Sequence, residues 1–108
     1  MDENEMIQIA MQMILYAGDA SNYIKEALDA IVDGNEDLAN SKMKETNTAI
    51  EEAHRYQTGV VQRDAAGERA QYSLLFTHAQ DTLMTIMSEK RIAEKMIAMY
   101  DSLLKKIG

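Results

Sequence analysis

A histidine followed three positions later by an aspartate is the arrangement in this sequence with the clearest chemical use. His78 and Asp81 lie in residues 74–84, a mostly apolar stretch. Positions three apart share one face of a helix, and this line continues through Thr85 and Ser88. A histidine that is neutral near pH 7 can act as a nucleophile, and neighbouring polar side chains can orient it. Taken alone, the pattern is more often that of a hydrogen-bonded structural histidine than of a nucleophile.

The other histidine raises the question of a metal site. Glu51 and His54 have the Glu-x-x-His spacing that di-iron helical bundles use. Such a site needs a second copy of the motif, and position 75, three residues before His78, is Leu. A ferritin-like di-iron protein is therefore disfavoured, and His54 is expected to be a polar or interfacial residue. No Ser-His-Asp triad, glycine-rich phosphate loop or zinc pattern can be assembled from the remaining residues.

The composition predicts a single domain spanning residues 1–108. The chain is 46% hydrophobic and 27% charged, which is ordinary for a globular domain of this length. It has no cysteine, which excludes disulfides, thiolate metal ligands and a nucleophilic thiol. The first residues are acidic where a signal peptide would be basic, and no apolar run approaches the roughly 18 residues of a membrane span. We therefore expect a cytoplasmic domain with no membrane insertion.

The net charge of −7 disfavours nucleic acid as a partner, because binding to a phosphate backbone relies on clustered Lys and Arg. The charge is also uneven. Residues 1–54 hold twelve acids and three bases, whereas residues 55–108 hold six acids and eight bases. Solvated helix faces explain this simply. Alternatively, the C-terminal half handles an anionic group or partner.

The fold is expected to be all-α, with three long antiparallel helices per subunit. Because there is no proline, glycines are the main residues that can end a helix. Gly34 and Gly67 suit the left-handed position that follows a helix end. This predicts helices over residues 4–32, 36–66 and 73–107, each about 45 Å or more in length. Gly18, inside the first of them, is interpreted as allowing close packing or a bend rather than a break.

The apolar pattern indicates how these helices pack. The second helix has a seven-residue repeat with small residues, typical of a seam against other helices, formed by Ala39, Met43, Thr46, Ile50, Ala53, Gln57 and Val60. The third helix is apolar over an arc wider than the roughly 100° that a monomeric bundle requires. We therefore expect it to be buried on two sides, once within the subunit and once between subunits.

Residues 73–85, Ser-Leu-Leu-Phe-Thr-His-Ala-Gln-Asp-Thr-Leu-Met-Thr, resemble the active-site signature of a known family. It is the enzyme IIA component of the lactose/cellobiose-type, or diacetylchitobiose-type, sugar phosphotransferase systems of bacteria. Residues 51–58 and 17–20 are similar to two further segments of the same family, and the chain has the length of the whole family domain.

The resemblance implies a cytoplasmic homotrimer that relays a phosphoryl group during uptake of a lactose-type or β-glucoside (cellobiose) sugar. His78 would accept this group from the histidine-containing phosphocarrier protein and pass it to a cysteine of a cognate IIB component. Asp81 matches a family aspartate that binds a metal ion on the trimer axis, and three carboxylates plus waters suit Mg²⁺. Gln80 is expected to donate a hydrogen bond to the phosphoryl group. No nucleotide is required, because the donor is itself a phosphohistidine.

The sequence also departs from the family pattern. Many members have a histidine where Thr82 stands, and histidine is common where Tyr16 stands. A different class of function remains open as well, namely a helical adaptor or regulatory protein that binds partners through its Met-rich third helix and performs no phosphoryl chemistry.

Overall fold

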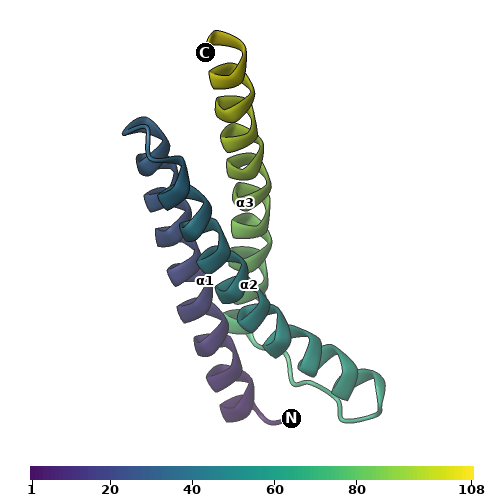
Figure 1. The fold of residues 1–108 in the computed structure, drawn as a ribbon. Coiled ribbons are helices and arrows are strands. Elements are labelled where there is room, and N and C mark those ends of the chain that lie inside the picture. The colour runs from purple at the N-terminus through teal and green to yellow at the C-terminus, as the bar shows by residue number, and fades with distance from the viewer.

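Three long helices and two turns make up the protein. A computed structural model describes all of residues 1–108, with α1 at Glu3–Val32, α2 at Glu36–Ala65 and α3 at Leu74–Ile107. The chain runs up, down and up again, so that consecutive helices are antiparallel while α1 and α3 run in the same direction (Figure 1). The bundle is a rod of 58 × 20 × 18 Å. The all-α prediction is confirmed, and the helix ends lie within one or two residues of the predicted ones.

The two predicted glycine stops have a clear physical basis. After α2, Gly67 adopts a φ of 102°, which side chains other than glycine rarely tolerate. The Glu68 backbone N–H then donates to the Arg63 carbonyl at 3.0 Å, and the Gly67 N–H donates to the Asp64 carbonyl at 3.1 Å. This pair of bonds is a Schellman motif, which satisfies the last carbonyls of the helix. Gly34, with a φ of 76°, closes α1 in the same manner.

Side-chain caps begin the next helices. The Asn35 side-chain oxygen accepts a hydrogen bond from the Leu38 N–H at 3.1 Å, which starts α2. The Ser73 hydroxyl accepts from the Phe76 N–H at 3.2 Å and starts α3. Each cap satisfies a backbone donor that the first helical turn leaves free. The Ser73 cap therefore sets where α3 begins, and with it the position of His78 in the second turn.

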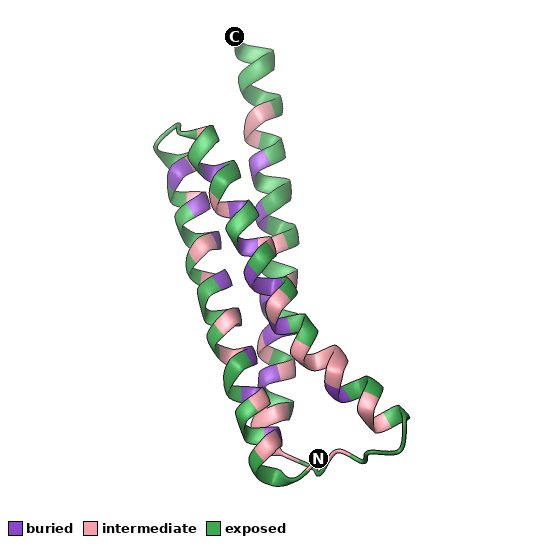
Figure 2. Ribbon diagram, turned by 60° about the horizontal axis from the view of Figure 1, so that its bottom comes forward, coloured by how far each residue is buried: buried purple, intermediate pink, exposed green.

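The core is built mainly from small side chains, so the helices approach one another closely. The buried positions form strips on the inner sides of the three helices (Figure 2). The predicted seam on α2 is confirmed: its members are buried, except for half-buried Gln57. The fully buried Thr46 hydroxyl donates to the Lys42 carbonyl at 2.9 Å, so no donor is left unsatisfied there. The small buried side chains are those of ten alanines and one threonine: Ala10, Ala17, Ala20, Ala27, Ala30, Ala39, Ala49, Ala53, Ala79, Ala93 and Thr46.

Because alanine adds only a methyl group beyond the backbone, α1 and α2 can lie close together along most of their length. Larger buried side chains fill the remaining space, and the largest fully buried ones are Met6, Met13 and Leu83.

The outer side of α3 is uncovered in the single chain. Large apolar side chains are exposed along it, among them Ile92 at 59%, Met99 at 58% and Leu103 at 58%. The C-terminal turns of α3, yellow in Figure 1, project beyond the α1–α2 turn. Within one chain, α3 is therefore buried on one side only, and the second side that the sequence pattern predicts is left exposed.

Gly18 does not interrupt α1, which continues through it as predicted. A Cβ atom added at Gly18 would meet no atom within 4 Å. The predicted close packing is therefore absent within one chain. None of the three helices has an apolar segment long enough to cross a membrane.

Candidate functional site

His78 lies in the second turn of α3 and its side chain is exposed. The Thr82 hydroxyl donates to the His78 backbone carbonyl at 2.8 Å, so this hydroxyl is used by the helix rather than by the imidazole ring. Residues 70–88 contain a single charged residue, Asp81. The imidazole is thus held on a regular helix, open to solvent and surrounded on its own helix by almost uncharged side chains.

The helical period shows which way His78 points. Met96 follows it by eighteen residues, which is about five full turns, so the two side chains project from the same flank of α3. Met96 lines a groove between α3 and α1, together with Ser21 and Lys25 of α1. His78 therefore lies on the flank of α3 that borders α1.

Asp81 projects away from the core. It is exposed, and its Cα lies about 200° around the helix from the fully buried Ala79. Thr85 and Ser88 continue the same outward line, and both are exposed. The Thr85 hydroxyl donates to the Asp81 carbonyl at 2.9 Å. The predicted polar line on one face of α3 is thus present, and its carboxylate is available to a ligand or to another copy of the chain.

Gln80 lies on a different side of α3 from His78. Positions two apart on a helix do not face each other, and the Gln80 side chain is half-buried whereas His78 is exposed. Within one chain the structure therefore does not bring the Gln80 amide to the His78 ring.

The structure gives no support to a di-iron site. No group of three or more His, Cys, Asp or Glu side chains lies close enough to hold a metal ion within one chain. His54 is exposed on α2, and its Nδ1 is 3.2 Å from the hydroxyl oxygen of Thr58, one turn further on. This contact within the helix fits the polar role expected for His54.

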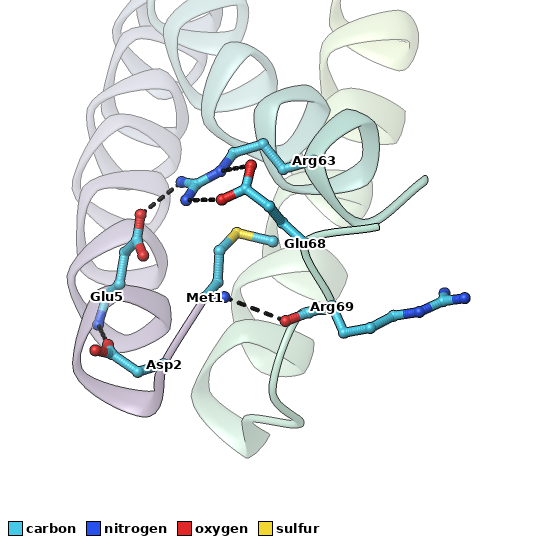
Figure 3. Close-up of polar contacts among 6 residues, drawn as sticks. All are labelled: Met1, Asp2, Glu5, Arg63, Glu68 and Arg69. Carbon is cyan, nitrogen blue, oxygen red and sulfur yellow. Dashed lines mark hydrogen bonds and ion pairs between the residues drawn. The ribbon is translucent and has the colours of Figure 1, made fainter. Parts of the chain in front are cut away.

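The segment that leads into α3 is held by an ion-pair cluster that the sequence pattern did not reveal (Figure 3). The Arg63 guanidinium donates to Glu5 of α1 at 2.5 Å and to both carboxylate oxygens of Glu68, at 3.0 and 3.2 Å. It thereby joins α1, the end of α2 and the α2–α3 loop. Arg63 and Glu5 are 58 residues apart. Only the tertiary structure shows which acid pairs with this arginine.

Backbone contacts add to this connection. The Asp64 carboxylate accepts a hydrogen bond from the Ala70 N–H at 2.9 Å. The Gln71 N–H donates to the Met1 carbonyl at 3.3 Å, and the Met1 ammonium donates to the Arg69 carbonyl at 3.2 Å. The loop before α3 is therefore attached to both other helices, which restrains the start of the helix that carries His78.

Comparison with known proteins decides the family. Residues 8–101 match the family described as "PTS system, Lactose/Cellobiose specific IIA subunit". The chain belongs to this family. It is 36% identical over 104 residues to the lichenan-specific phosphotransferase enzyme IIA component of Bacillus subtilis, covering 96% of this chain and 94% of that protein. It is also 38% identical over 100 residues to the lactose-specific EIIA component of Lactococcus lactis, covering 93% and 95% of the two chains.

A solved structure agrees with the sequence relatives. The crystal structure of the PTS cellobiose-specific enzyme IIA from Bacillus anthracis superposes with a TM-score of 0.87 at 38% identity, covering 98% of this chain and 95% of that one. The resemblance predicted from residues 73–85 is therefore confirmed as family membership. It supports a role in sugar phosphotransfer for this IIA protein.

The two departures from the family pattern have clear structural places in this IIA protein. The Tyr16 ring stacks on Tyr56 of α2, with ring centroids 6.2 Å apart, so it helps to join α1 to α2. Thr82 is half-buried and bonded to the backbone carbonyl of His78. Neither side chain forms a hydrogen bond with the exposed imidazole of His78.

The ion pair at the loop predicts a dependence of stability on pH. Arg63 lowers the pKa of Glu68 below its usual 4.5 by hydrogen bonding and by charge attraction. Because the pKa of Glu68 is lowered in the folded state, the pair's contribution to folding stability is complete above pH 4.5. It is lost as the pH falls through the pKa of Glu68 in the folded protein. We expect Glu68→Gln to melt slightly below the wild type at neutral pH, because the pair is solvent-exposed.

The measurement is thermal unfolding of both proteins across a pH series. Their melting temperatures should converge at pH values well below 4.5, where Glu68 is protonated in both states. A constant difference at all pH values would show that the charge of Glu68 does not act through this pair.

Proposed function

We propose that this IIA protein is a phosphohistidine carrier and that His78 holds the phosphoryl group. The observation that carries the proposal is the exposed imidazole on a regular helix, within the segment that resembles the family signature. The names of the relatives, lichenan- and lactose-specific, favour a β-glucoside or lactose type of sugar. The carrier would work in the cytoplasm.

The chemistry needs few groups from the protein. A nitrogen of the neutral His78 ring attacks the phosphorus of the phosphorylated histidine-containing phosphocarrier protein, and the P–N bond of the donor breaks as the new P–N bond forms. A thiolate of the IIB component then attacks the same phosphorus and releases the His78 ring. Catalysis of such in-line transfers rests mainly on positioning and charge stabilisation. The fixed helix supplies the positioning, and no nucleotide site is required.

We also propose that three copies assemble through the outer side of α3. The exposed apolar side chains there form a stripe along most of the helix, including Ile92, Met99 and Leu103. Exposed apolar surface of this extent is typical of an interaction site. In a cyclic trimer, one flank of α3 would meet the opposite flank of the next copy. Gln80 is therefore proposed as a hydrogen-bond donor to the phosphoryl group on the His78 of a neighbouring copy.

The outward position of Asp81 fits a shared cation. One chain offers a single carboxylate there, whereas three copies around an axis would offer three. Clustered carboxylates repel one another unless they are protonated or neutralised, and oxygen ligands suit Mg²⁺. The ion would supply this neutralisation. Asp81 is the one residue of each chain that we expect to bind the ion.

Replacing the carboxylate tests this assignment. We expect Asp81→Leu to remain trimeric, or to become a more stable trimer, and to bind no divalent metal, because it exchanges clustered charge for apolar contact. Sedimentation and metal analysis after incubation with Mg²⁺ measure both properties. Ser88→Leu, two turns along the same line, is the control and should keep its metal. Dissociation of Asp81→Leu into monomers would contradict the prediction.

Phosphoryl flow tests the function as a whole. With phosphoenolpyruvate, the two general phosphotransferase proteins and the cognate IIB component, phosphoryl should appear on IIB only when this protein is present. Phosphorylation of IIB at the same rate without it would overturn the carrier role.

A further inference from the structure

Charged residues are sparse at one level of the bundle, where Asp81 is the charged residue nearest to His78 in the sequence. Residues 6–18 of α1, 56–62 of α2 and 70–80 before and within α3 contain no Asp, Glu, Lys or Arg, although 27% of the chain is charged. We call these three segments the uncharged band. Nothing in the helix patterns requires the three gaps in charge to coincide.

The fold brings the three segments of the uncharged band together. Met1 and Gln71 are joined by a backbone hydrogen bond, and α1 and α3 run in the same direction, so residues 7–15 lie level with about 75–84. Tyr16 stacks on Tyr56, which places 56–62 beside the same part of α1. His78 therefore lies within this band, on the flank of α3 that borders α1.

The uncharged band also exposes apolar side chains. Six large ones are more than one third exposed: Ile7 37%, Met11 47%, Leu15 58%, Val61 56%, Tyr72 77% and Leu74 73%. Between Leu15 and Val32, α1 exposes no large apolar side chain, and these turns carry Asp19, Lys25 and Glu26. The stripe on the outer side of α3, in contrast, continues to Leu103. An interface between copies along α3 would use the long stripe, whereas the α1 surface is confined to the level of His78.

We propose that the exposed apolar side chains of α1 in the uncharged band, centred on Met11 and Leu15, form the docking surface for the phosphorylated donor protein. The inference rests on the proposed function of His78. The donor carries a phosphoryl dianion toward a protein of net charge −7, and like charges within a Debye length of about 8–10 Å would oppose it. Residues 6–18 of α1 carry no carboxylate, which lessens this repulsion beside His78, and their exposed apolar side chains provide the contact.

The test measures the second-order rate constant of phosphoryl transfer from the phosphorylated histidine-containing phosphocarrier protein to this chain. Met11→Asp and Leu15→Asp should each lower it at least about tenfold. Met11→Lys should lower it similarly, because a lysine also disrupts an apolar contact. The control is Asn22→Asp, an exposed position two turns above Leu15 on nearly the same side of α1 but outside the uncharged band, which should stay within about twofold.

Three results would overturn the inference. Rates within about twofold of wild type for both Asp variants would show that the donor docks elsewhere. An unaffected Met11→Lys would show that only net charge matters. A smaller sedimenting species for the Asp variants would assign the surface to contacts between copies. If the wild type accepts no phosphoryl group, the proposed carrier function itself fails. If the wild type and the variants all accept it at equal rates, only the proposed docking surface fails.

Discussion

His78→Gln will receive no phosphoryl group from the phosphocarrier protein and will deliver none to IIB. We expect the rate to fall at least about a thousandfold, because a glutamine amide cannot replace the imidazole as a nucleophile. The fold should survive, since His78 is exposed and its backbone carbonyl keeps the bond from Thr82. Transfer assays with the donor and with IIB measure the loss.

His54→Gln is the matched control. His54 is also an exposed histidine on a long helix, and the one hydrogen bond of its ring is with the Thr58 hydroxyl. It should transfer at the wild-type rate. Loss of transfer in His54→Gln with retention in His78→Gln would reverse the assignment of the two histidines.

We expect Ile92→Asp to dissociate the trimer proposed above. Ile92 is 59% exposed in the single chain and lies on the outer side of α3 at the edge of the groove against α1, so the change should leave the subunit fold intact. A carboxylate buried at each contact between copies would be strongly unfavourable, and we expect the dissociation concentration to rise by about two orders of magnitude or more. Analytical ultracentrifugation over a concentration series measures this shift.

Thr48→Asp provides the comparison for Ile92→Asp. Thr48 is exposed on α2 and lines a groove between α1 and α2, away from α3. It introduces the same charge and should leave the assembly unchanged. A trimer that persists in Ile92→Asp would show that the outer side of α3 is not the contact between copies.

The helices were predictable because their signals are local. Gly34 and Gly67 end helices through bonds to residues within the same turn, and Asn35 and Ser73 begin helices through their own side chains. A sequence displays such signals directly. His78 and Asp81 were likewise predictable as neighbours on one face, because spacing on a helix determines which residues share a face.

Other features depend on contacts between distant segments. The cluster of Arg63 with Glu5 and Glu68 joins residues 58 positions apart, so no local pattern announces it. The uncharged band is visible along the sequence only as three separate gaps in charge. Its meaning emerges when the fold places these gaps at one level around His78.

The most direct test of the central claim is the intact mass of this IIA protein after incubation with phosphoenolpyruvate and the two general phosphotransferase proteins. The account predicts a gain of one acid-labile phosphoryl group per chain, mapped to His78 by fragmentation. No gain, with the general proteins shown to be active, or a phosphoryl group mapped to another residue, would contradict it.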